Sequence, residues 1–146
     1  MSSTAVDWAS LPPPQPLPDA DTAPFWQATA DGRLAICRCQ VCGTWHQPPL
    51  ERCRSCAGAT AFEPVSGRGT VYTFIVQRQP AVVGYFDVVP YAVGLVDLDE
   101  QHALRLPGRV VDIDPDDVHI GMRVKVRIEQ LPGGDFHVPV WLPETT

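Results

Sequence analysis

Short apolar runs separated by turn residues fill the second half of the chain. Residues 123–129 alternate strictly, with Val124, Val126 and Ile128 on one side and charged residues on the other, as in a half-buried strand. Five strands are predicted in all, over residues 69–77, 91–97, 102–113, 123–129 and 136–141. The third is expected to be interrupted at Pro107-Gly108, and Gly94 in the second suggests a bulge or barrel corner. This count predicts a small, partly open Greek-key barrel of the OB type.

The first third of the chain has a different pattern. Residues 1–20 hold five prolines between positions 12 and 18, which favour an extended path without regular hydrogen bonds. This leader is either a loose tail or an arm that lies along a partner, with Trp8 and Leu11 as its anchors. Residues 21–33 predict a helix capped by Asp21 or Thr22, with Pro24 in its first turn and Gly32 at its end. The apolar face of this helix packs either on its own domain or on a partner chain.

Two pairs of cysteines lie between the predicted helix and the predicted barrel. Cys39-x-x-Cys42 and Cys53-x-x-Cys56 are separated by ten residues, and a glycine follows each pair. Two such knuckles bring four thiolates to one ion and complete a tetrahedral zinc site. Because a closed site leaves no position for water or substrate, we expect one structural zinc ion per chain. Iron in a rubredoxin-like site, or a site that has lost its metal, are the alternatives.

Other candidate ligands fit this pattern less well. Cys37 lies only two residues before Cys39 and is expected to be a buried strand cysteine, with a reactive thiol as the alternative. His46 could replace a cysteine ligand, but four cysteines already complete the site, so it is expected to pack over the ribbon. The acidic run at residues 112–117 lacks the glycine and the distal glutamate of a calcium loop, and predicts a helix-capping turn instead.

Composition and charge argue against several classes of function. The chain has 146 residues, 45% of them hydrophobic, and a net charge of −6. Residues 1–32 carry −4, residues 33–68 carry +3 and residues 69–146 carry −5. An acidic protein is a poor nucleic-acid binder because phosphate affinity needs many basic contacts. No membrane span or secretion signal is expected, and the chain is interpreted as cytoplasmic, where cysteines stay reduced. No nucleophile motif, phosphate loop or paired carboxylates point to an independent enzyme.

Several blocks of sequence together resemble one known family. The blocks are Phe25-Trp26, Gly32-Arg33-Leu34, Arg38-Cys39-x-x-Cys42-Gly43, Pro48-Pro49, Cys53-x-x-Cys56, Ser66 to Phe74, Pro90 to Val93, Leu95 to Glu100 and Ile120 to Val124. In order and spacing they resemble the zinc-ribbon/OB-fold, acyl-CoA-associated family once called domain of unknown function 35. The sequence departs from that family at Leu106 to Arg109 and in its long proline leader.

The resemblance implies a mainly β protein with an N-terminal helix, a rubredoxin-like zinc ribbon and a five-stranded OB-fold barrel. The segments expected are a leader over 1–20, the helix over 21–35, the ribbon over 36–62 and the OB-fold domain over 63–146. Family members are non-catalytic subunits of thiolase-like enzymes that act on acyl-CoA thioesters by thiolysis, acyl transfer or retro-aldol cleavage. Others associate with hotdog-fold enoyl-CoA hydratases. By analogy, we expect a thiolase-like partner in a two-plus-two heterotetramer, with acyl-CoA (steroid, aromatic or short-chain) bound mainly by the partner.

Site residues follow from these expectations. The metal ligands are Cys39, Cys42, Cys53 and Cys56, and no catalytic residue is assigned to this chain. Phe25, Trp26 and Trp45 are candidates for the partner interface. Arg38, Arg52, Arg54 and Arg68 form the only basic segment, so they are candidates for contacts with the CoA phosphates. The competing hypotheses are a hydratase subunit, an OB-fold nucleic-acid-binding module and an independent enzyme.

Overall fold

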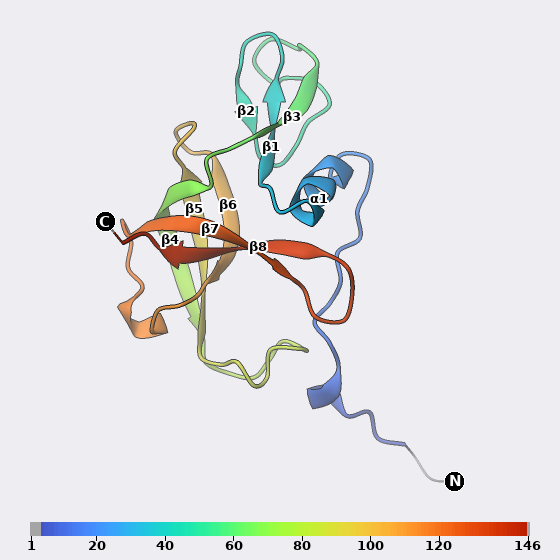
Figure 1. The fold of residues 1–146 in the computed structure, drawn as a ribbon, viewed down its shortest axis with the longest axis vertical. Coiled ribbons are helices and arrows are strands. Elements are labelled where there is room, and N and C mark those ends of the chain that lie inside the picture. The colour runs from blue at the N-terminus through green and yellow to red at the C-terminus, as the bar shows by residue number, and fades with distance from the viewer. Residues whose placement is uncertain (1–3, 146) are drawn as a thin grey trace.

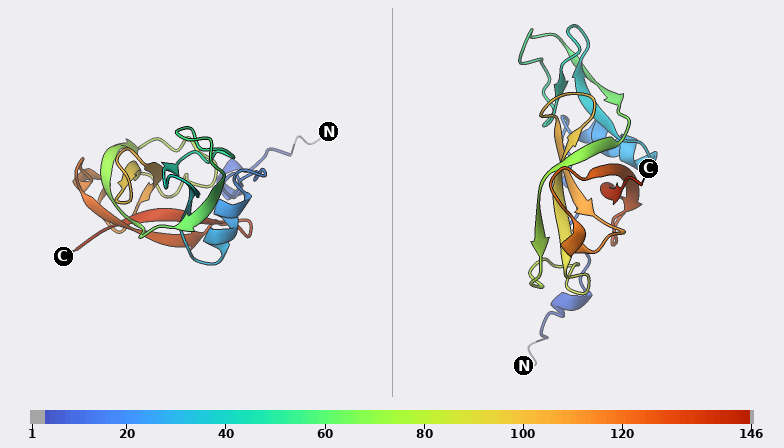
Figure 2. Two further views of the ribbon diagram at one scale, coloured as in Figure 1. Left: turned by 90° about the horizontal axis from the view of Figure 1, so that it is seen from above. Right: turned by 90° about the vertical axis from the view of Figure 1, so that its left-hand side faces the viewer.

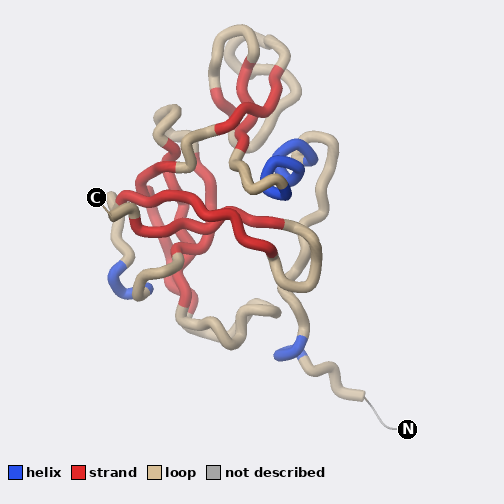
Figure 3. Tube along the Cα trace, viewed as in Figure 1, coloured by secondary structure: helices blue, strands red, loops and turns tan. Residues whose placement is uncertain are grey.

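The computed structural model describes residues 4–145 of the chain as a ribbon, a helix and a barrel stacked along one long axis (Figure 1). The helical elements are η1 (Trp8–Ser10), α1 (Ala23–Ala30) and η2 (Pro115–Asp117). The strands are β1 (Ala35–Cys39), β2 (Trp45–His46), β3 (Thr60–Pro64), β4 (Arg68–Gln77), β5 (Tyr91–Leu98), β6 (Arg105–Val110), β7 (Arg123–Gln130) and β8 (His137–Pro143). The predominance of strands in Figure 3 confirms the mainly β fold class.

The helix α1 is shorter than the predicted span. Thr22 occupies the N-cap position and Pro24 lies in the first turn, as expected, although the Thr22 side chain makes no capping hydrogen bond. Gly32 adopts a φ of +78°, a left-handed conformation that ends the helix. Residues 31–34 therefore form a turn, and residue 35 already belongs to β1 instead of the helix.

Three antiparallel strands in the order β2-β1-β3 form the ribbon. The ribbon shares its core with the barrel, because Leu34, Ile36 and Trp45 belong to the same buried cluster as the barrel residues. The side chain of Gln101 also accepts a hydrogen bond from the Trp45 amide at 2.9 Å and donates one to its carbonyl at 3.1 Å. These contacts fix the ribbon against one end of the barrel.

The barrel has the strand order β4-β5-β6-β8-β7 and is closed, whereas the sequence predicts a partly open one. Pairing of β4 with β7 completes one side, and β6 meets β8 only at Val110 and Trp141. The strand β6 runs straight through Pro107-Gly108, where the sequence predicts a break. Proline is tolerated there because β6 lacks a pairing partner on its β8 side at that position.

The barrel has a register shift where the sequence did not predict one, and a short helical turn where the sequence did predict one. The register shift lies in β4, between Val71 and Thr73, and not at Gly94, which pairs regularly with Phe74. The predicted turn at residues 114–117 is confirmed as η2, whose N-cap Asp114 accepts a hydrogen bond from the amide of Asp116. The nearby acids are engaged in ion pairs, Asp116 with Arg78 and Asp112 with Arg127.

The leader is not a loose tail along its whole length. Residues 12–15 lie against the barrel, and Pro13 is buried. The leader and the ribbon project from opposite ends of the molecule (Figure 2). Among residues 4–145, no helix combines the length and apolar character that a membrane crossing requires.

Candidate functional site

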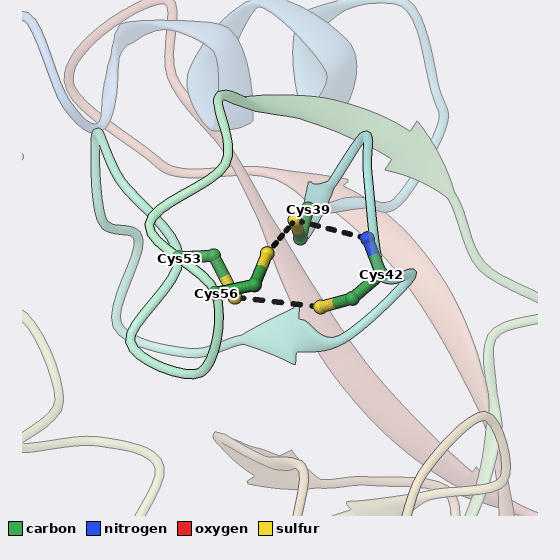
Figure 4. A group of neighbouring side chains, drawn as sticks. All are labelled: Cys39, Cys42, Cys53 and Cys56. Atoms are coloured by element: carbon green, nitrogen blue, oxygen red, sulfur yellow. Dashed lines mark hydrogen bonds between the residues drawn. The ribbon is translucent and has the colours of Figure 1, made fainter.

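The four knuckle cysteines converge at the tip of the ribbon (Figure 4). Their sulfur atoms all lie within 4.8 Å of one another. The Sγ atoms of Cys39 and Cys56 are 3.5 Å apart, and those of Cys42 and Cys53 are 3.6 Å apart. A tetrahedron of zinc–sulfur bonds near 2.3 Å places sulfur atoms about 3.8 Å apart, so the spacing fits one zinc ion.

Backbone amides point at the sulfurs in both knuckles. The amides of Val41 and Cys42 donate to Sγ of Cys39 at 3.4 and 3.3 Å, and the amide of Ser55 donates to Sγ of Cys53 at 3.3 Å. Such donors stabilise thiolate ligands. Gly58 closes the second knuckle, where a Cβ would lie 3.0 Å from Sγ of Cys39. The glycine therefore lets the backbone pass close to the metal centre.

The electrostatics of the cluster favour a bound cation. The Thr44 hydroxyl and amide beside Cys42 lower the pKa of that thiol to about 6. The Gly58 amide acts to lower the pKa of Cys56, but the neighbouring sulfurs of Cys39 and Cys42 outweigh it and raise that pKa to about 12. Four crowded thiols cannot all ionise unless a positive charge lies among them. The zinc ribbon thus has four clustered cysteines able to bind one metal ion. Four sulfur ligands complete a tetrahedral site and leave no coordination position open for water or substrate.

Cys37 and His46 lie outside this cluster. Cys37 is 1% exposed in β1, and its thiol donates to the carbonyl of Leu50 at 3.4 Å, which confirms the buried strand cysteine. His46 pairs with Cys37 across β1 and β2 and is fully buried. Burial, with a smaller contribution from Arg54, lowers the pKa of His46. His46 is therefore a neutral core residue of the ribbon.

The four arginines of the basic segment have different surroundings. Arg38 stacks over Trp45 with 4.6 Å between Cζ and the ring centre, and it pairs with Glu63 at 3.5 Å. Arg68 pairs with Glu144 at 3.4 Å. Arg52 and Arg54 are exposed and form no ion pair with the rest of residues 4–145. The free guanidinium groups thus lie on the second knuckle of the ribbon.

The predicted aromatic residues are divided between a cleft and the core. Phe25 and Trp26 of α1 line an apolar cleft of about 420 Å³ between the helix, the ribbon and the barrel. Trp26 also packs edge-on against Phe136, with ring centres 5.5 Å apart. Trp45 is only 6% exposed and fills the core where the ribbon meets the barrel, so it does not present a surface to a partner. The interface prediction for Trp45 is corrected accordingly.

The cleft itself was not foreseen from the sequence. Its walls are the ribbon residues Gln47, Pro49 and Phe62, and the facing residues of β6 and β8, namely Leu106 to Arg109 and Val138 to Val140. Apolar side chains also cover the outer face of the barrel next to it, where Ile75, Val93, Leu95 and Pro107 gather. Only the register of β4, β5 and β6 brings these four residues together.

Two family models match the chain. One is described as the rubredoxin-like zinc ribbon domain of ChsH2 and matches residues 26–63, and the other as the C-terminal OB-fold domain of ChsH2 and matches residues 62–129. Together they span the ribbon and most of the barrel.

Known proteins and solved structures are also similar to the chain. It is 39% identical over 90 residues to a DUF35 domain-containing scaffold protein of Methanocaldococcus jannaschii, covering 60% of the chain and 62% of that relative. It is 32% identical over 130 residues to a 3-oxo-4,17-pregnadiene-20-carboxyl-CoA hydratase alpha subunit of Mycobacterium tuberculosis, covering 89% and 40%. The chain therefore spans less than two thirds of the length of these relatives. A chain of the structure titled Ltp2-ChsH2(DUF35) aldolase superposes with a TM-score of 0.80 and 32% identity, covering 88% of this chain and 98% of that one.

Proposed function

We infer the function of this chain from one premise: it belongs to the DUF35 family, the ChsH2-type proteins that join a rubredoxin-like zinc ribbon to an OB fold. We propose that the chain is a non-catalytic accessory subunit of an enzyme complex that acts on acyl-CoA thioesters, such as those of steroid degradation. In this role it stabilises the catalytic partner and helps to shape the channel that receives the acyl-CoA.

One observation carries this proposal. The superposition on the chain of the Ltp2-ChsH2(DUF35) aldolase includes 98% of that chain, with a TM-score of 0.80. The similarity thus extends over the helix, the ribbon and the barrel together, and not over a common zinc ribbon or OB fold alone. A shared fold by itself would leave the function open, since OB folds serve many roles.

The proposed role of the metal centre is structural. Cys39, Cys42, Cys53 and Cys56 would hold one zinc ion, which supplies folding free energy to a ribbon too small for a core of its own. The ribbon in turn forms one wall of the cleft through Gln47 and Pro49. Metal binding would therefore preserve the shape of the surface offered to the partner.

The cleft and the neighbouring outer face of the barrel are the proposed partner interface. Phe25 and Trp26 lie in the cleft, and exposed Pro107 belongs to both the cleft and the outer face. An apolar surface with this extent on one side of a chain is typical of a protein–protein contact. Arg52 and Arg54, with no ion-pair partners in the described chain, are the strongest of the four arginine candidates for the CoA phosphates.

The partner is proposed to be a thiolase-like protein, because the similar structure is named as an aldolase complex. The two-plus-two assembly is proposed by analogy with dimeric thiolase-like proteins. The alternative is a hotdog-fold enoyl-CoA hydratase. The hydratase alpha subunit of Mycobacterium tuberculosis favours this second candidate, since 89% of the chain aligns with it. That alignment covers 40% of the hydratase subunit, and the remainder of that subunit lies outside the alignment.

A tagged pull-down from the native host, with mass spectrometry and native mass measurement, tests the proposal. A thiolase-like protein in a complex of defined mass is expected, and a hotdog-fold protein would select the alternative. The variant Pro107→Glu should lose the partner, because it places a charge on the apolar face. Lys125→Glu, a charge change on the exposed face of β7, is the matched control and should retain it. Recovery of the unchanged chain alone would refute both candidates.

A further inference from the structure

The leader is fixed to the barrel at residues 12–15. The side-chain amide of Gln15 donates to the carbonyl of Pro132 at 3.0 Å. A Cβ at Gly84 would lie 2.3 Å from the backbone nitrogen of Pro13, and one at Gly133 would lie 2.3 Å from Cβ of Pro12. Gly84 and Gly133 lie in two loops that are far apart in the sequence. Both loops contact the leader so closely that no side chain would fit at either glycine. Residues 12–15 are therefore held against the barrel.

A short hydrogen-bonded turn, η1, precedes this anchor. The carboxylate of Asp7 accepts from the amide of Ala9 at 3.2 Å, and the hydroxyl of Ser10 donates to the carbonyl of Asp7 at 2.9 Å. The amide of Ser10 also donates to the carbonyl of Asp7 at 3.1 Å. The prolines that follow restrict the backbone further. These hydrogen bonds and prolines restrict the backbone of the turn, which lowers the entropy cost of docking.

Large apolar side chains on this turn face solvent. Trp8 is 59% exposed, Val6 55% and Leu11 37%. By contrast, Trp45 and Trp141 are 6% and 0% exposed. Tryptophan is the residue type that most often dominates the binding energy of protein interfaces, and it does so when its ring enters a dry pocket. The turn lies at the end of the molecule opposite the zinc ribbon (Figures 1 and 2), so it is separate from the cleft.

We propose that Val6, Trp8 and Leu11, called here the leader turn, form a second docking site for the partner enzyme, which receives Trp8 in an apolar pocket rimmed by Lys or Arg side chains. The basic rim follows from charge: Asp7 is the one charged side chain among residues 4–18, and the next one along the chain, Asp19, is also acidic. The same charge repels phosphate-rich surfaces such as nucleic acids and anionic membranes. The identity of the partner rests on the proposed function, whereas the location of the site rests on the leader alone.

Affinity measurements on the full chain test this inference. The thiolase-like protein recovered with the chain is purified and immobilised, and its Kd is measured for the unchanged chain, Trp8→Ala and Leu17→Ala. Leu17 is the matched control, because it is 95% exposed on the same leader but outside the leader turn. Trp8→Ala should weaken binding about tenfold or more, and Leu17→Ala less than about twofold. All three should unfold at the same temperature, because neither side chain is buried.

Charge gives an independent readout. Binding of the unchanged chain should weaken as NaCl rises, and Asp7→Asn should reduce that salt dependence. Equal Kd values for the unchanged chain and Trp8→Ala would overturn the leader-turn site and leave the proposed function intact. Failure of the unchanged chain to bind would overturn both. Loss of affinity in Trp8→Ala and Leu17→Ala alike would also overturn it, because the effect would then belong to the leader as a whole.

Discussion

Gly108 and Trp141 touch where the barrel closes: a Cβ at position 108 would lie 2.8 Å from Nε1 of Trp141. The indole of Trp141 is fully buried and is the largest such side chain in the barrel. Its strand, β8, meets β6 through the single pairing of Val110 with Trp141. The missing side chain at position 108 therefore lets one large ring fill the gap at a seam that few backbone hydrogen bonds hold.

Gly108→Ala should lower the free energy of unfolding by about 1–3 kcal/mol, because the added methyl would press on the buried indole of Trp141, which has to shift to make room. The matched control is Gly94→Ala on the neighbouring strand, where the closest neighbour of the Cβ would be a methyl group of Val110 at 3.0 Å and the next atoms lie at 3.9 Å. A smaller loss is expected there. Urea unfolding of the zinc-loaded proteins measures both, and an equal loss would contradict a specific conflict with Trp141.

Removal of one sulfur ligand should abolish stoichiometric zinc binding. The unchanged chain is expected to hold one zinc ion, and Cys56→Ser to hold much less, with a Tm roughly 10 °C lower because several kcal/mol of folding free energy come from the metal. Cys37→Ala is the control: this cysteine is buried but lies outside the cluster, so its zinc content should stay at one. Elemental analysis and differential scanning fluorimetry provide the measurements. Full zinc content in Cys56→Ser would refute the four-cysteine site.

Reversal of the two free arginines should weaken use of the acyl-CoA substrate by the complex. The double variant Arg52→Glu/Arg54→Glu replaces two exposed cations by anions, and we expect the KM for acyl-CoA to rise about tenfold with kcat little changed, as two phosphate contacts are lost. Arg78→Glu is the control, since Arg78 pairs with Asp116 of η2, on the barrel and away from the ribbon. Steady-state kinetics of the reconstituted complex measure KM and kcat for the unchanged chain, the double variant and the control. An unchanged KM in the double variant would place the CoA phosphates elsewhere.

The buried histidine predicts a dependence of stability on pH. Burial lowers the pKa of His46 below its ordinary value of 6.5. The unfolded chain therefore takes up a proton near pH 6.5 while the folded chain does not, so stability is complete above that pH and falls as the pH decreases below it. Urea midpoints at pH 7.5 and 5.5 in excess zinc should show this fall. His46→Phe, which fills the same space without a titrating group, should reduce it. If the urea midpoint falls equally between pH 7.5 and 5.5 in the unchanged chain and in His46→Phe, groups other than His46 control the loss of stability in acid.

The zinc ribbon could be predicted from sequence because its determinants are local. Each Cys-x-x-Cys pair with a following glycine forms a knuckle from adjacent residues, and the two knuckles need only ten residues between them. The alternation of residues 123–129 likewise predicted β7 and its buried Val124. The predictions that failed depend on distant neighbours. Trp45 was expected at an interface, but it is buried because the ribbon folds onto the barrel.

The sequence by itself determined the order of the elements, the mainly β class, the four cysteines and the family, since each depends on residue types at short spacing. The tertiary structure alone decided the rest. It closed the barrel at Val110 and Trp141, gathered the cleft from α1, the ribbon, β6 and β8, and left Arg52 and Arg54 without an ion-pair partner among residues 4–145. It also held the proline leader at Gly84 and Gly133, residues about 70 and 120 positions further along the chain. Such contacts join residues that are far apart in sequence, and no local pattern of hydrophobicity or charge records which of them will meet.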